Sequence, residues 1–315
     1  MTQDFAPDLG ELPTQANYKK TVRCLGGADL SFWLSQIAHH ENRLIVMVAN
    51  TQNELNQLDT ELAFFGVNAK VFPDWEILAY DQLSVHQDII SERIALLTNM
   101  PKSGVLLVSV QTLMQRIAPP SWLIGQHFDL KVGDKFDIEQ ERERLTQAGY
   151  THTDTVFEPG EFAVRGSIID IFAIGQSLPF RLDLFDDEIE TIKFFDPETQ
   201  RTHTDLSLEK LKKDAESSLN LHQPHKLPTH AKIDQFSLLP AKEFALEDGR
   251  DLFRQNFASL FPAASARKID LYNDVMAGIA PQGIEYYAPL FFELEQWMTM
   301  GSLFSYLPKD ALIIS

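Results

Sequence analysis

Residues Phe157–Asp196 read FEPGEFAVRGSIIDIFAIGQSLPFRLDLFDDEIETIKFFD. In this stretch, short runs of β-branched and aromatic residues alternate with turn residues, which is the usual pattern of strands joined by tight turns. The pattern predicts three strands in a row, over Phe162–Ile171, Phe180–Phe185 and Ile189–Phe195. The acidic residues 186–188 separate the last two strands, and we expect them to form a turn rather than a metal or acid–base site.

The second of these strands places an arginine and an aromatic ring on one face. Residues i and i+2 of a strand share a face, so Arg181, Asp183 and Phe185 point one way. The intervening Leu182 and Leu184 point the other way, toward an expected core. Arginine and aromatic residues are enriched in protein interfaces, so this outer face is a candidate binding surface. The alternative is a surface arginine paired with Asp183 beside a half-buried ring, since exposed apolar residues are common.

Asp170 is the one carboxylate inside the apolar run SIIDIF. If it is buried there, its charge requires a partner. We expect that partner to be an arginine or a set of backbone donors, and the role of Asp170 to be structural rather than catalytic.

The rest of the chain alternates apolar strands with helical segments. Runs such as LIVMVA at Leu44–Ala49 and VLLVSV at Val105–Val110 are typical of parallel strands buried on both faces. A strand around residues 70–72 and helices over 52–65 and near 88–99 complete the alternation. This order predicts a parallel α/β sheet covered by helices.

A charged helix precedes the strands described first. We expect it over Ile138–Gln147, with Asp137 as the N-cap and Gly149 as the C-terminal stop. The charged run Glu139–Arg144 predicts a solvated helix face. Helix and strands together indicate one small α+β domain inserted into the larger α/β domain.

Several long blocks carry a family resemblance. RGSIIDIF and RLDLFDDEIETIKFFDPETQRT resemble the small inserted domain of UvrB, the damage-verifying subunit of bacterial nucleotide excision repair. They resemble still more closely the N-terminal UvrB-homology module of the bacterial transcription-repair coupling factors (Mfd). Four further blocks resemble this family in the same order: WEILAYDQLSVHQDIISERIALL (Trp75–Leu97), VLLVSVQTLMQRIAP (Val105–Pro119), LLPAKEF (Leu238–Phe244) and GIEYYAPLFF (Gly283–Phe292). Collinear blocks over nearly the whole chain make the resemblance specific.

The resemblance implies a fold and a domain order. The expected fold is a degenerate RecA/helicase-like parallel sheet domain with an inserted small α+β domain of the UvrB type. The expected segments are residues 1–127 for the first part of the helicase-like domain, 128–213 for the inserted domain and 214–315 for the return to the larger domain. We expect the chain to be a fragment of a longer protein, and the run ALIIS near its end to be a core strand.

The resemblance also implies a partner. In this family the inserted domain recruits the repair protein UvrA, and the matching contact positions here are Arg165, Arg181 and Phe185. The chain would then be a non-catalytic scaffold that couples stalled transcription to nucleotide excision repair. In the intact protein, other domains would bind RNA polymerase and DNA and translocate along DNA with ATP.

The position of the phosphate loop argues against an enzyme. A nucleotide-binding domain of this order needs G-x-x-x-x-G-K-[ST], whose backbone N–H groups and lysine bind the phosphates. Leu25–Phe32 reads LGGADLSF, which has no lysine, and Asp29 would repel phosphates. We therefore expect no cofactor and no catalytic residue. The alternative is a nucleotide-dependent DNA helicase or translocase fragment, which the missing lysine disfavours.

Two further features argue against DNA binding by this chain. UvrB grips DNA with a long β-hairpin, but Tyr80–Asp88 leads directly into an expected helix over Ile89–Leu97 and leaves no room for one. The net charge of −18 is also unfavourable, because a protein holds DNA by neutralising its phosphates. A protein partner is the better hypothesis.

Composition bounds the remaining possibilities. The single cysteine, Cys24, cannot form an internal disulfide, which fits a reducing cytoplasm. No apolar run approaches the ~20 residues that a membrane-spanning helix needs, so we expect no membrane partner. His222 and His225 have metal-like spacing, but Pro224 lies between them in a loop-like stretch, and we expect no metal site.

Overall fold

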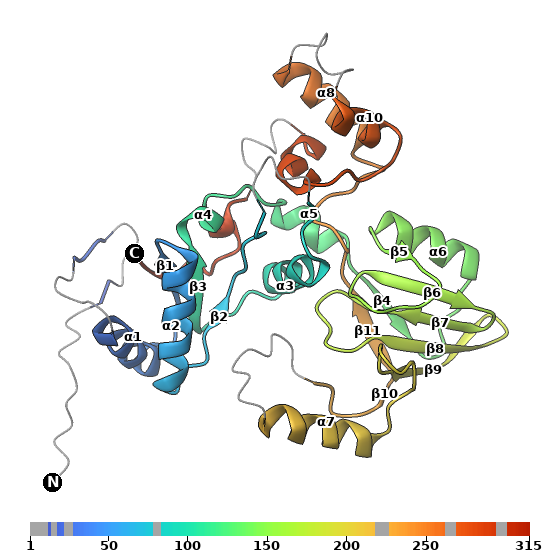
Figure 1. The fold of residues 1–315 in the computed structure, drawn as a ribbon, viewed down its shortest axis with the longest axis horizontal. Helices are drawn as coiled ribbons and strands as arrows, with labels where there is room; N and C mark the ends of the chain where they lie inside the picture. Colours follow the sequence, from blue (N-terminus) through green and yellow to red (C-terminus); the bar gives the residue numbers. More distant parts are fainter. Residues whose placement is uncertain are drawn as a thin grey trace. The chain divides into compact units, whose positions relative to one another are not determined.

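The computed structural model describes residues 12–13, 18–21, 28–77, 83–217, 227–261, 269–293 and 301–315, and Figure 1 draws its fold. Unit 1 of two compact units comprises Met1–Asp74, Asn99–Gln115 and Ser302–Ser315, and unit 2 comprises Trp75–Thr98 and Arg116–Gly301. This division is coarser than the three expected segments, because unit 2 joins the expected inserted domain to residues 75–98 and to most residues after 213.

Unit 1 is built on a parallel four-stranded sheet with the order β12, β1, β3, β2. The strands are β1 (Leu44–Ala49), β2 (Lys70–Val71), β3 (Gly104–Ser109) and β12 (Leu312–Ile314). All six residues of β1 are buried, so both of its faces are covered. The parallel sheet expected from the apolar runs is confirmed, and the ALIIS strand belongs to it.

Helices cover one face of this sheet. From α1 (Ala28–His40) and α2 (Gln52–Phe64), residues such as Leu34 and Leu58 pack against Ile45 and Met47 of β1. Ile45 and Met47 are two residues apart and therefore share that face. The four-residue helix α4 (Val110–Leu113) follows β3 directly, and η2 (Leu303–Ser305) is a short 3-10 helix.

Some predictions concern positions outside the described residues. These positions are Cys24, the glycines at 26–27 where a degenerate phosphate loop is expected, Tyr80–Gln82, His222 and His225.

Unit 2 contains a six-stranded sheet with the order β10, β9, β8, β7, β6, β5. Its strands are β5 (Thr151–His152), β6 (Glu161–Arg165), β7 (Ile168–Ile171), β8 (Phe180–Phe185), β9 (Glu188–Phe194) and β10 (Lys232–Ile233). The expected single strand over Phe162–Ile171 is wrong, because it is two antiparallel strands, β6 and β7. Gly166, with φ +64°, turns the chain between them, which a residue with a side chain does at a cost.

A bulge shapes the hairpin of β8 and β9. Asp183 pairs with Thr191, whereas the next residue, Leu184, pairs with Ile189, so Glu190 is an extra residue in β9. The bulge lets Ile189 and Ile192, three residues apart, both face the core. The inner face of the sheet is apolar, and Phe180 stacks on Phe236 with ring centroids 4.1 Å apart.

The other strands and helices of unit 2 are short. A two-stranded sheet pairs β4 (Phe128–Lys131) with β11 (Gln235–Leu238). The helices are α3 (Gln87–Thr98), α5 (Pro120–Gly125), α6 (Ile138–Gln147), α7 (Asp205–Ser217), α8 (Arg250–Leu260), α10 (Asp270–Met276) and the 3-10 helix η1 (Ile284–Phe291). Among the described residues, no helix is both long and apolar enough to cross a membrane.

Helix α6 begins and ends where the sequence predicts. The Asp137 side chain accepts hydrogen bonds from the backbone N–H groups of Glu139 and Gln140, which satisfies two donors of the first turn. Gly149, with φ +90°, follows the helix and turns the chain away.

A buried ion pair joins distant parts of unit 2. Arg93 of α3 donates from Nε to Glu243 Oε1 at 2.7 Å, and the two side chains are 0% and 7% exposed. The Arg93 guanidinium also lies 4.8 Å from the centroid of the Trp75 ring. Trp75 in turn packs edge-on against Tyr286 of η1. These contacts tie Trp75 and Arg93 to Glu243 and Tyr286 within unit 2.

Candidate protein-binding surface

The face of the six-stranded sheet opposite its apolar core carries polar or exposed side chains. We call it the outer face, and the residues that define it are Arg165, Asp170, Arg181, Asp183, Phe185, Thr191 and Lys193. Strand pairing arranges them in rows, because Asp170 lies opposite Arg181, and Arg181 lies opposite Lys193. In β8, Phe180, Leu182 and Leu184 are buried and alternate with the outer-face residues, as the sequence pattern predicts.

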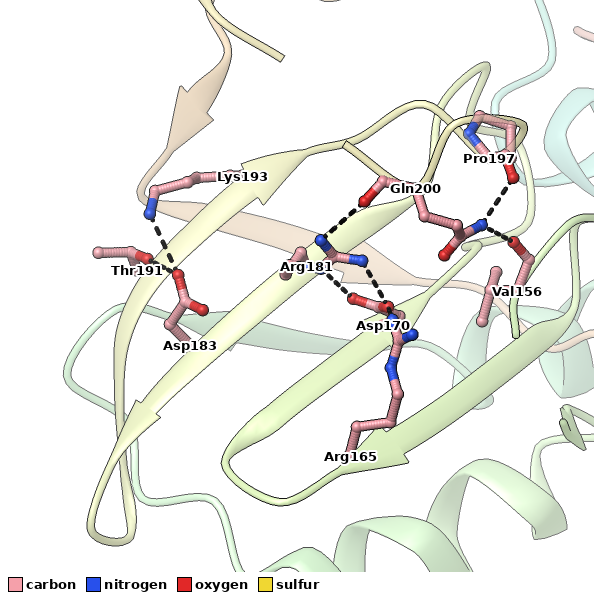
Figure 2. Close-up of polar contacts among 9 residues, drawn as sticks. All are labelled: Val156, Arg165, Asp170, Arg181, Asp183, Thr191, Lys193, Pro197 and Gln200. Carbon is pink, nitrogen blue, oxygen red and sulfur yellow. Dashed lines mark hydrogen bonds and ion pairs between the residues drawn. The ribbon is translucent and has the colours of Figure 1, made fainter. Parts of the chain in front are cut away.

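Asp170 is the centre of this face (Figure 2). Its side chain is fully buried, and Arg181 donates to both carboxylate oxygens, from Nε at 2.7 Å and from Nη2 at 2.8 Å. Arg165 donates from Nη2 to Oδ2 as well. The expected arginine partner of Asp170 is therefore confirmed, and there are two of them.

The alternative pairing of Arg181 with Asp183 is wrong. Asp183 instead accepts hydrogen bonds from Thr191 Oγ1 at 2.8 Å and from Lys193 Nζ at 3.1 Å. Burial alone would raise the pKa of Asp183, but the hydrogen bonds and the charge of Lys193 outweigh it and lower the pKa. Two separate ion-pair groups therefore cover the outer face.

Hydrogen bonds and a contact with an aromatic ring fix the Arg181 side chain. Besides its two bonds to Asp170, it donates from Nη1 to the backbone oxygen of Gln200 at 3.0 Å (Figure 2) and lies over the Phe195 ring, 4.6 Å from the centroid. The hydrogen bonds to Asp170 raise the pKa of Arg181, although burial opposes them. Its side chain is 14% exposed, so little of it is available to a partner in this conformation.

The Gln200 carbonyl, which accepts the hydrogen bond from Arg181, is itself fixed. The Gln200 amide donates to the backbone oxygens of Val156 at 3.0 Å and of Pro197 at 2.6 Å. Asp196 accepts from the backbone N–H of Glu198 at 2.8 Å and closes the same turn. The turn therefore belongs to the support of Arg181.

Arg165 and Phe185 are the accessible members of the outer face. The Arg165 side chain is 43% exposed at the end of β6, and Phe185 is 69% exposed at the end of β8. Arg165 is level with Asp183, two strands away, and Phe185 lies two residues further along β8. With strands about 4.8 Å apart and a rise of about 3.3 Å per residue, the backbones of Arg165 and Phe185 are about 12 Å apart.

The hairpin tip that carries Phe185 is braced by a neighbouring loop. The backbone N–H of Phe136 donates to the oxygen of Asp187 at 2.7 Å, and that of Ile189 donates to the oxygen of Asp134 at 3.0 Å. Lys135 Nζ and Asp187 Oδ2 form an exposed ion pair at 2.9 Å. The acidic residues 186–188 thus lie at the turn as expected, with Glu188 already in β9.

The structure therefore joins two of the three site residues that the resemblance implies. Arg165 and Arg181 share Asp170, while Phe185 is on the same face but apart from them. Sequence reasoning missed Lys193, Gln200 and Phe195, which come into contact only through the bulged pairing of β8 and β9 and the turn after β9. The strand pattern of RLDLF gave no sign of that register.

A second group of charged residues lines a small pocket in unit 2. Trp75, Lys242, Glu243 and Glu285 are among its lining residues, and it has room for about one water molecule. Burial lowers the pKa of Lys242 and raises that of Glu285. The pocket is too small for a nucleotide. Among the described residues, no group of three or more His, Cys, Asp or Glu side chains is arranged to hold a metal ion.

Comparison with known proteins gives a consistent result. Residues 128–212 match the family model of the UvrB interaction domain. The chain is 37% identical over 320 residues to the transcription-repair-coupling factor of Haemophilus influenzae, covering 99% of this chain and 25% of that protein. It is 35% identical over 308 residues to the transcription-repair-coupling factor of Escherichia coli, covering 96% and 24%. A third such factor, from Staphylococcus aureus, is 31% identical over 63% of the chain. The chain thus spans about a quarter of the length of its first two relatives.

Proposed function

We propose that this chain, which belongs to the transcription-repair-coupling factor family and corresponds to its UvrB-like N-terminal module, is a non-catalytic scaffold that recruits UvrA. The observation that carries the proposal is the outer face. It lies within the residues that match the UvrB interaction domain, and it presents Arg165 and Phe185 to solvent on a braced sheet.

The chemistry of the face fits a protein partner with acidic groups beside an apolar pocket. Arg165 supplies an exposed guanidinium, and Arg181 adds positive charge behind it through Asp170. Phe185 supplies an exposed ring that buries its area on binding. Truncating a central arginine or aromatic anchor of an interface typically costs about 2 kcal/mol or more. Recruitment of UvrA in this way would couple stalled transcription to nucleotide excision repair.

The alternative function is a nucleotide-dependent DNA helicase or translocase fragment. The lack of a lysine in Leu25–Phe32 and the presence of Asp29 argue against a nucleotide site in this chain. We assign translocation with ATP, and binding of RNA polymerase and DNA, to the parts of the intact protein beyond this chain. The cytoplasm is where such a protein would act.

A calorimetric titration of UvrA into this chain tests the proposal, with ATP alone as a second titrant. We expect saturable UvrA binding that is weakened by Phe185→Ala and weakened further by Arg181→Glu, which places a negative charge beside Asp170. Phe64→Ala is the matched control, because Phe64 is 85% exposed but lies in unit 1. UvrA affinity unchanged by both outer-face variants would sink the assignment. Heat from ATP without UvrA would favour the helicase alternative.

A further inference from the structure

The Asp170 carboxylate accepts different numbers of hydrogen bonds from its two arginine partners. Arg181 donates to both oxygens, whereas Arg165 donates to Oδ2 alone. One negative charge cannot balance two positive charges, so the group of three keeps one uncompensated positive charge. The side chains of Arg165 and Arg181 are 43% and 14% exposed, and the uncompensated charge is therefore accessible mainly at Arg165.

The position of the Arg165 guanidinium depends on Asp170. The backbone of Arg165 is fixed, because it pairs with Ile168 across the two-residue turn that contains Gly166. Strand pairing does not fix the position of the Arg165 side chain. Within the part of the chain that the structure describes, Asp170 is the one side-chain partner recorded for Arg165. Without that carboxylate, the long arginine side chain would sample several rotamers above the sheet.

We propose that Asp170 is a positioning residue for partner binding. It holds Arg165 through one terminal nitrogen. The remaining N–H groups of the same guanidinium then donate hydrogen bonds to a carboxylate of the partner. Arg181 fixes Asp170 from the other side. The inference rests on the proposed function, and it adds the chemical group that the surface recognises.

Two properties of arginine make this arrangement effective. The planar guanidinium has five N–H donors in a rigid fork, so it binds one carboxylate on one edge while another edge stays open. A side chain that is already held also loses less conformational freedom when the partner arrives. The Asp170 carboxylate therefore acts on affinity without lying in the interface.

A double-mutant cycle separates positioning from a merely structural role. UvrA affinity is measured by calorimetry for the wild-type chain, Asp170→Asn, Arg165→Ala and the double variant, with a thermal melt of each to establish folding. Asp170→Asn is expected to weaken binding about fivefold when Arg165 is present, the effect of releasing one ordered side chain. With alanine at position 165, the same change is expected to have an effect of less than about twofold. Equal losses in both backgrounds would overturn the proposal.

Arg165→Lys provides a second test that does not disturb Asp170. Lysine keeps the charge but lacks the planar fork, so it cannot present separate edges to Asp170 and to the partner. We expect it to lose nearly as much affinity as Arg165→Ala, and wild-type affinity in this variant would refute the proposal. This arm decides the question if Asp170→Asn does not fold. Failure of the wild-type chain to bind UvrA is a different result, because it contradicts the proposed function itself.

Discussion

The buried ion pair of unit 2 allows a test of the fold that is independent of any partner. Replacing Glu243 by glutamine keeps the shape of the side chain but removes its charge. The Arg93 guanidinium is fully buried and lies 2.7 Å from Glu243, so it then loses the carboxylate of this ion pair. It retains its position over the Trp75 ring, and a neutral amide oxygen remains as a weaker acceptor.

The expected loss follows from the geometry. Two unit charges about 4 Å apart attract each other by about 4 kcal/mol at an effective dielectric constant near 20. Removing one partner of a buried pair typically costs about 3–5 kcal/mol. Burial raises the pKa of Glu285, and the charge of Glu243 raises it further. Glu243→Gln relieves this smaller repulsion, so we expect a loss of about 3 kcal/mol, or about 6–12 °C in Tm for a unit of this size.

Chemical denaturation, followed by tryptophan fluorescence and by far-UV circular dichroism, measures this loss. Asp251→Asn is the matched control, since the Arg254–Asp251 pair is exposed, at 56% and 82%, and such pairs contribute less than about 1 kcal/mol. The reasoning fails if Glu243→Gln lowers the free energy of unfolding by no more than this control. It is supported further if Arg93→Met restores stability to the Glu243→Gln chain, because the buried charge that lost this carboxylate is then gone.

Three further predictions concern the outer face and the turn at Gly166. Phe185→Ala should weaken UvrA binding at least tenfold, as measured by calorimetry. It should lower the free energy of unfolding by less than about 1 kcal/mol, because the Phe185 ring is 69% exposed. A loss of stability as large as the loss of binding energy would contradict this. The pKa of Asp183 is lowered in the folded chain, so its stabilising effect is present above about pH 4 and is lost as the pH falls through the folded value. In urea titrations Asp183→Asn should therefore lower stability by less than about 1 kcal/mol at pH 7, and this loss should shrink as the pH falls through the folded value. A loss of equal size at every pH would refute the link. Gly166→Ala should destabilise the chain by about 1–2 kcal/mol because φ is positive at this position. Gly125→Ala should not, because φ is ordinary there and an added Cβ meets nothing within 4 Å. Equal unfolding midpoints for the two variants would be inconsistent with strain at the turn.

Local signals were sufficient for several elements of the fold. The apolar run of β1 and the capping residues of α6 predicted those elements to the residue, since both depend on neighbours in sequence. The turn at Gly166 was missed because RGS lies within an apparently continuous alternation of apolar and polar residues. A two-residue turn shifts that alternation by one residue, so Phe162 and Val164 share a face with Ile169 and Ile171, and the adjacent Ile168 and Ile169 are the sign that was overlooked.

The partner of Arg181 illustrates what a strand sequence cannot supply. Residues i and i+2 share a face, but their backbones lie about 6.6 Å apart, whereas residues opposite each other on neighbouring strands are about 5 Å apart. The nearest carboxylate to Arg181 is consequently Asp170, across the ladder, rather than Asp183 on the same strand. Finding it from sequence requires the register of β7 against β8, which depends on turn geometry.

The two accessible anchors of the outer face are fixed by different means, and this bears on how an acidic chain would bind acidic groups. Asp170 holds the Arg165 guanidinium, while the bulge at Glu190 and the backbone bonds from Asp134 and Phe136 hold the tip that carries Phe185. A net charge of −18 disfavours the approach of acidic groups over long range, but salt screens that effect beyond about 8 Å at physiological ionic strength. Affinity then depends on short-range contacts. Because the separation of Arg165 and Phe185 is already set, their side chains lose little conformational freedom on binding. One accessible positive charge and one aromatic ring would therefore suffice as the core of a specific interface.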